Sequence, residues 1–139
     1  MNIEPGCRIG ALAFVNKELI AFLGYGVYEG NFEPPGFEPP TVETLMGVEV
    51  ARAIGGDDDK LRRLAESFLK SADYEALRKV PRLKLDNGSV AWAHECHWGA
   101  EHIMKQLIEK IVGQMKLPVV IHRPLRDEKG CCTDFVVMQ

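Results

Sequence analysis

One short segment, residues 92–99, holds most of the side chains in this chain that could carry chemistry. It contains two imidazoles, a carboxylate, a thiol and two indoles, in the order Trp92-Ala93-His94-Glu95-Cys96-His97-Trp98-Gly99. Three kinds of chemistry compete for these groups: metal binding, nucleophilic catalysis and stacking on a flat ligand.

The metal interpretation uses His94 and Cys96 as zinc ligands, because donors two residues apart on a strand point to the same face. A closed zinc site needs four ligands and an open one needs three. The further ligands are not evident, and neither an HExxH motif nor a CxxC pair is present. The sequence therefore predicts no metal and no cofactor.

The nucleophile interpretation pairs Cys96 with His94 or His122. A catalytic cysteine needs a lowered pKa, and the N-terminus of a helix beginning near Ala100 could supply it. No third group that would orient the histidine is evident in the sequence. We keep a small cysteine- or metal-dependent enzyme as an alternative, and we expect a non-catalytic protein.

The binding interpretation takes aromatic rings as surfaces for a base, arginines as partners for phosphate, and polar side chains as readers of ring edges. Stacking contributes about 1–3 kcal/mol per base, and guanidinium groups pair well with phosphate. Trp92 is expected in the core, since tryptophans on strands are more often buried there. The expected ligand-binding residues are Tyr25, Tyr28, Arg82, Asn87, His97, Trp98, Arg123 and Arg126.

Length and composition are those of one globular domain over residues 1–139, with 46% hydrophobic and 27% charged residues. A net charge of −3 argues against a nucleic-acid polymer as the partner, because phosphate neutralisation needs a basic excess. No run of residues is long and apolar enough to span a bilayer, and no leader pattern opens the chain. We therefore expect a cytoplasmic protein with four reduced cysteines and no membrane partner.

The secondary-structure pattern predicts an α+β fold, with a largely antiparallel sheet packed against two or three helices. Two β-hairpins are expected at residues 7–30 and 82–98, and a terminal strand at 133–138. In the first hairpin, alternation places Leu23, Tyr25 and Val27 on one face of the second strand. Glycines leave the opposite face with few side chains, so another backbone or a ligand could approach it closely. Helices are expected over 41–54, from 57 through 72, from Asp73 to just before Pro81, and over 100–115, while residues 122–126 read as a basic turn.

The order of several short motifs resembles the phage Thoeris anti-defence sponge family, the first type described. The motifs are Leu23-Gly24-Tyr25-Gly26-Val27-Tyr28-Glu29-Gly30, a proline-bearing loop, Leu85-Asp86-Asn87-Gly88, and Glu95-Cys96-His97-Trp98-Gly99 followed by a helix. The resemblance covers residues 6–35 and 83–115.

The resemblance implies a protein that sequesters a small nucleotide signal of the cyclic ADP-ribose type, and in some members a cyclic oligonucleotide. It also implies a homo-oligomer, either a dimer or a ring of dimers, with aromatic rings on the base and arginines on the phosphates. If the protein is phage-encoded, it would act in the host cytoplasm. A third alternative is a protein–protein inhibitor module built on the proline-rich loop around Phe32 and Phe37.

Overall fold

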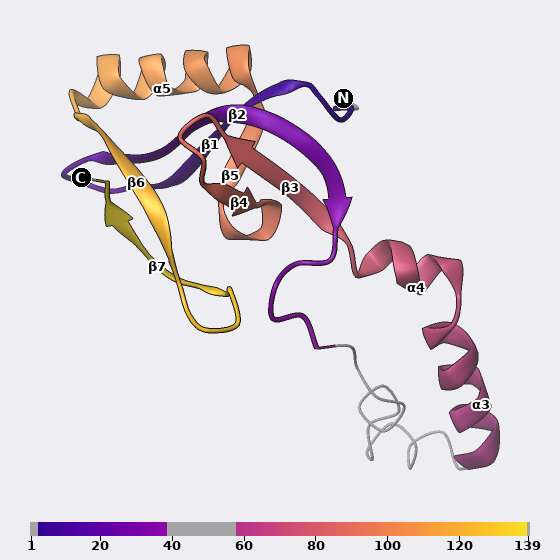
Figure 1. Ribbon diagram of the computed structural model, residues 1–139. Helices are drawn as coiled ribbons and strands as arrows, with labels where there is room; N and C mark the ends of the chain where they lie inside the picture. Colours follow the sequence, from indigo (N-terminus) through magenta and orange to yellow (C-terminus); the bar gives the residue numbers. More distant parts are fainter. Residues whose placement is uncertain (1–2, 39–57, 139) are drawn as a thin grey trace. The chain divides into compact units, whose positions relative to one another are not determined.

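Strands dominate the computed structural model, which describes residues 3–38 and 58–138 (Figure 1). Seven strands form a mostly antiparallel sheet, as the sequence predicts for an α+β fold. Their order is β4-β3-β2-β1-β5, with β6 paired to β2 and β7 paired to β6. The strands are β1 (Arg8–Val15), β2 (Ile20–Phe32), β3 (Val80–Leu85), β4 (Val90–Trp92), β5 (His97–Ala100), β6 (Val119–Arg126) and β7 (Cys132–Val137).

Local turn chemistry explains both hairpins. Between β1 and β2, the Asn16 side-chain oxygen accepts hydrogen bonds from the main-chain N–H groups of Glu18 and Leu19, at 2.8 and 2.9 Å. Between β3 and β4, the Asn87 side-chain oxygen accepts from the N–H of Ser89 at 2.9 Å. Asparagine favours such turns because its short side chain replaces a main-chain acceptor. Both predicted hairpins are present, as β1 with β2 and as β3 with β4, but the second ends at Trp92 and not at residue 98.

The predicted faces of β2 are wrong in one respect. Leu23 packs in one core cluster, whereas Tyr25 packs against the other, so these two side chains do not share a face. The cause is an irregularity in the β1–β2 register: Ala11 pairs with Gly24 and Leu12 pairs with Phe22, which leaves Leu23 without a partner. An unpaired residue of this kind reverses the alternation beyond it.

The close approach expected beside the β2 glycines occurs at Gly26. A Cβ atom built there would collide with the carbonyl oxygen of Lys84 and lie 2.7 Å from the Cα of Leu85. Gly26 pairs with Leu85 in the β2–β3 ladder. The neighbour that needs the missing side chain is therefore main chain of β3, and no ligand is required to explain this glycine.

Two apolar clusters make the core. One contains Leu23, Tyr28, Leu83 and Leu85, with Trp98 and Phe135 packed against it. The other joins Leu12, Ile20 and Phe22 to Met104 and Ile108 of α5 (Glu101–Met115), the helix that runs across the sheet in Figure 1. Helical spacing predicted α5 correctly, and its first-turn Glu101 accepts a hydrogen bond from Arg8 at 3.2 Å.

Two further predictions are corrected by the structure. The strand expected over residues 90–98 is interrupted by a short 3-10 helix, η1 (Ala93–Glu95), so Trp92, His94 and Cys96 do not alternate on one strand. The basic turn expected over 122–126 is instead part of strand β6, held by antiparallel pairing with β7. The Glu95 side chain caps η1 by accepting from the N–H of Trp92, whereas pairing with β7 decides the backbone of residues 122–126.

The chain divides into two compact units, residues 1–36 with 80–139, and residues 37–79. Within the second unit the structure describes α3 (Asp58–Leu69), predicted from helical spacing, and α4 (Ala72–Leu77), predicted as a short helix from Asp73 to just before Pro81. The Ser71 hydroxyl caps α4 by accepting from the N–H of Tyr74 at 3.2 Å. The helix expected over 41–54 lies outside the described residues. Among the helices that the structure describes, none has both the length and the apolar character to cross a bilayer.

Candidate functional site

A pocket of about 450 Å³ opens in the first unit. Its lining comes from three distant segments of the chain. These are the loop after β2, the end of β4 with η1, and β7 with the turn before it. The lining residues are Pro34, Pro35, Trp92, His94, Glu95, Gly130, Cys131, Cys132, Thr133, Asp134 and Phe135. This volume falls in the range of pockets for small molecules.

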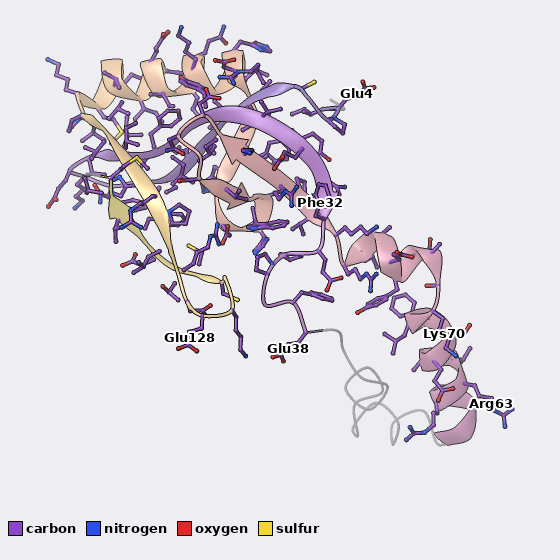
Figure 2. The ribbon with its side chains drawn as sticks, viewed as in Figure 1. Glu4, Phe32, Glu38, Arg63, Lys70 and Glu128 are labelled. Carbon is purple, nitrogen blue, oxygen red and sulfur yellow. The ribbon has the colours of Figure 1, made fainter. Side chains whose placement is uncertain are left out.

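Two loops interlock at the rim of the pocket. The Cys131 thiol donates to the carbonyl oxygen of Pro35 at 3.6 Å. A Cβ atom at Gly130 would lie 2.6 Å from the Cβ of Pro35, so the main chain of Gly130 packs against the Pro35 ring. The turn that presents Cys131 is fixed by Asp127, whose side-chain oxygen accepts from the N–H groups of Lys129 and Cys131. Figure 2 labels Glu128 in this turn and Phe32 at the end of β2.

An ion pair joins η1 to β6 beside the pocket. The Arg126 guanidinium donates to both carboxylate oxygens of Glu95, at 2.7 and 3.0 Å, and to the carbonyl oxygens of Val90 and Gly130. The side chain of Glu95 is only 7% exposed, and its Oε1 also accepts from the N–H of Trp92. Arg126 therefore fixes two of the three segments that line the pocket.

The aromatic surface of the pocket comes from Trp92 and Phe135. Trp92 is 5% exposed, in agreement with the expectation that it belongs to the core, and it also lines the pocket. Phe135 is half-buried and packs against the first core cluster. Both rings are held rigidly, which lowers the entropic cost of stacking on them.

The Cys96 thiol lies beside the pocket lining, where burial is the main cause that raises its pKa to about 12. The thiol donates to the carbonyl oxygen of Trp92 at 3.5 Å. At neutral pH such a thiol carries a negligible fraction of thiolate, the nucleophilic form. Burial also raises the pKa of Cys132, and the structure pairs no cysteines into a disulfide. Over residues 3–38 and 58–138, no three histidine, cysteine or acidic side chains are placed to hold a metal ion.

Of the aromatic residues predicted to bind ligand, Tyr28 lies in the core, and Trp98 and Tyr25 are partly buried and pack against it. The rings of Tyr28 and Trp98 stack with centroids 5.7 Å apart, and the Tyr28 hydroxyl donates to the side chain of Asn31 at 2.5 Å. Tyr25 meets Phe22 edge-on at 4.9 Å, and burial raises its pKa. The structure thus brings Tyr28 and Trp98 together, and places Tyr25 in the other cluster.

The predicted polar site residues are dispersed. Arg82 donates to Glu29 at 3.0 Å and lies 4.0 Å from the centroid of the Phe32 ring. Asn87 stabilises its own turn, and His97 and Arg123 are exposed on β5 and β6. Arg126 alone adjoins the pocket, through its bonds to Glu95 and Gly130.

None of the eight predicted site residues lines the pocket, and most of its lining was missed by sequence reasoning. The residue types offered little signal, because prolines, cysteines and a phenylalanine are common in loops and strands. His94 and Glu95 did stand in the segment singled out for chemistry. The proximity of residues 34–35, 92–95 and 130–135 depends on sheet pairing that no local pattern encodes.

Comparisons with known proteins add no relative. No family model matches the chain, and neither the curated proteins nor the solved structures contain a match.

Proposed function

We propose that this protein binds a small molecule with a flat ring and holds it without chemical change. The observation that carries the proposal is the pocket of about 450 Å³, lined by the rigid rings of Trp92 and Phe135 and by Pro34 and Pro35. A pocket of this size accommodates a nucleotide or much of a cyclic dinucleotide. Proline rings and indoles both present flat apolar faces to a base.

The resemblance narrows the proposed ligand to a nucleotide immune signal, of the cyclic ADP-ribose type or a cyclic oligonucleotide. Sequestration of that signal would counteract bacterial anti-phage defence. The homo-oligomer implied by the same resemblance is part of this proposal, and light scattering at two protein concentrations tests it. A monomeric mass at both concentrations would remove the oligomer.

The chemistry beside the pocket supports binding over turnover. A cysteine enzyme would need Cys96 as a thiolate, and burial with the neighbouring Glu95 charge raises the pKa of this thiol to about 12. The nearby carboxylate of Glu95 is occupied by Arg126 and by the N–H of Trp92. It is therefore poorly placed to accept a proton from a substrate.

Depletion followed by release tests the proposal. Purified protein is incubated with cyclic ADP-ribose isomers and cyclic oligonucleotides, removed by filtration, and then denatured by heat. We expect one signal to disappear from the filtrate and to return chemically intact. A signal that returns altered would establish the enzyme alternative, with Cys96→Ser as the first variant. If no signal is depleted, sequestration is wrong and a protein partner becomes the better hypothesis.

A further inference from the structure

The charge of the pocket is unsuited to phosphate. Its ionisable lining consists of His94, Glu95, Cys131, Cys132 and Asp134, and none of the described lining residues is lysine or arginine. Sites that hold phosphate tightly use arginine, lysine, a metal ion or several main-chain N–H groups. Two carboxylates with one imidazole provide none of the first three.

The nearest guanidinium is already occupied. Both terminal nitrogens of Arg126 donate twice, to the two Glu95 oxygens and to the carbonyl oxygens of Val90 and Gly130. If Arg126 turned towards a phosphate, the carboxylate of Glu95, only 7% exposed, would lose its partner. Leaving a buried charge unpaired is costly, so the ion pair keeps Arg126 away from ligands.

Part of the pocket wall is the edge of a strand. Four consecutive residues of β7, Cys132 to Phe135, line the pocket. Consecutive side chains on a strand point to opposite faces, so a pocket that meets all four meets the strand along its edge. Within the described residues β7 pairs only with β6, which leaves this edge without a neighbouring strand. Such an edge presents main-chain donors and acceptors.

One of these main-chain groups already has a replaceable partner. The N–H of Phe135 donates to the side chain of Asp134 at 2.8 Å, and Asp134 is exposed. A neutral ring acceptor could take the place of this carboxylate without leaving any buried group unpaired. A heteroaromatic ring carries in-plane donors and acceptors at its edge and flat apolar faces. Such a ring could stack on the aromatic side chains of the pocket and form hydrogen bonds with the edge of β7.

From these observations we infer that the pocket recognises the uncharged heteroaromatic ring of its ligand, a nucleobase, and leaves the phosphate groups outside. The inference rests on the proposed function and assigns to this site the part of the ligand that it binds. It departs from the expectation that arginines hold the phosphates in the same site.

Paired nucleosides and nucleotides test this inference. Binding of adenosine, guanosine, cytidine and uridine is measured by calorimetry beside their 5′-monophosphates, with ribose 5-phosphate as the ring-free probe. We expect at least one nucleoside to bind within about threefold of its monophosphate, and ribose 5-phosphate not to compete. A monophosphate that binds more than tenfold tighter than its nucleoside, or competition by ribose 5-phosphate, would overturn the inference and leave the proposed function standing. Binding of no probe, together with no depletion of cyclic signals, would overturn both.

A charge substitution sharpens the test. Asp134→Lys places a cation at the pocket, and because the phosphate stays outside we expect it to change the preference for the monophosphate over the nucleoside by less than about threefold. Glu128→Lys is the matched control, because Glu128 is exposed in the adjacent turn and does not line the pocket. It makes the same change in net charge and should leave the preference unchanged. A preference for the monophosphate that rises more than about tenfold in Asp134→Lys and not in Glu128→Lys would place the phosphate inside the pocket and overturn the inference.

Discussion

At the scale of single residues, Arg126 has the most consequential contacts near the pocket. It neutralises the carboxylate of Glu95, which is 7% exposed, and ties η1 to the turn before β7 through the carbonyl oxygen of Gly130. Arg126, which was predicted from the sequence to bind phosphate, therefore holds two residues of the pocket lining, Glu95 and Gly130, in place. The same residue type serves either role, and only its neighbours distinguish them.

Arg126→Gln should destabilise the protein by about 2–4 kcal/mol, because the nearly buried Glu95 carboxylate would lose its charged partner. Arg123→Gln is the matched control, since Arg123 is exposed and lies three residues before Arg126 on the same strand. The control should change the free energy of unfolding by less than about 0.5 kcal/mol. Urea denaturation of both variants measures the difference. Equal stabilities would mean that the Glu95–Arg126 pair contributes nothing to the fold.

At the scale of elements, the pocket depends on contact between two loops. Pro35 after β2 meets Gly130 before β7, and the Cys131 thiol bonds to the carbonyl oxygen of Pro35. Neither loop is a regular element, and neither carries a motif. Together they set the distance between the proline wall of the pocket and the edge of β7.

Gly130→Ala should weaken ligand binding by roughly tenfold, because its new Cβ would lie 2.6 Å from Pro35 and push the two loops apart. Gly88→Ala is the matched control. Both glycines have positive φ, +87° and +90°, but no atom lies within 4 Å of the position that a Cβ would take at Gly88. The two variants should lose similar stability, about 1–2 kcal/mol from backbone strain, and only Gly130→Ala should lose affinity in calorimetry. A similar loss of affinity in both would show that the loop contact does not shape the pocket.

At the scale of the whole molecule, the division into two units bears on the prediction of a single domain over residues 1–139. The first unit contains all seven described strands, α5, both core clusters and the pocket. Its two chain segments come together where Phe32 of β2 pairs with Val80 of β3. The strands before and after residues 37–79 are therefore direct neighbours in the sheet.

Replacement of residues 37–79 by a Gly-Ser linker of about six residues, which reaches up to ~20 Å, should leave the first unit folded. We expect one cooperative thermal transition and the same ligand depletion as the full chain, because the core and the pocket lie in this unit. Circular dichroism and the filtration assay provide the measurements. An unfolded product would mean that the full chain folds as the single domain predicted from the sequence.

The sequence by itself determined the features that short stretches of chain encode. The Asn16 and Asn87 turns, the two hairpins and the amphipathic helix α5 follow from side-chain hydrogen bonding and periodicity within a few residues. These interactions form between neighbours in the chain, so their pattern is visible without a fold. The α+β class followed from the order of these elements.

Tertiary structure alone decided the remaining features. Pairing with β7 made a strand of residues 122–126, and a register irregularity turned Leu23 away from Tyr25. The pocket joins residues 34–35, 92–95 and 130–135, and the partner of Arg126 lies 31 positions away. Contacts between distant segments depend on the strand pairing of the whole sheet, and the sequence around a residue does not indicate which distant residue it will contact.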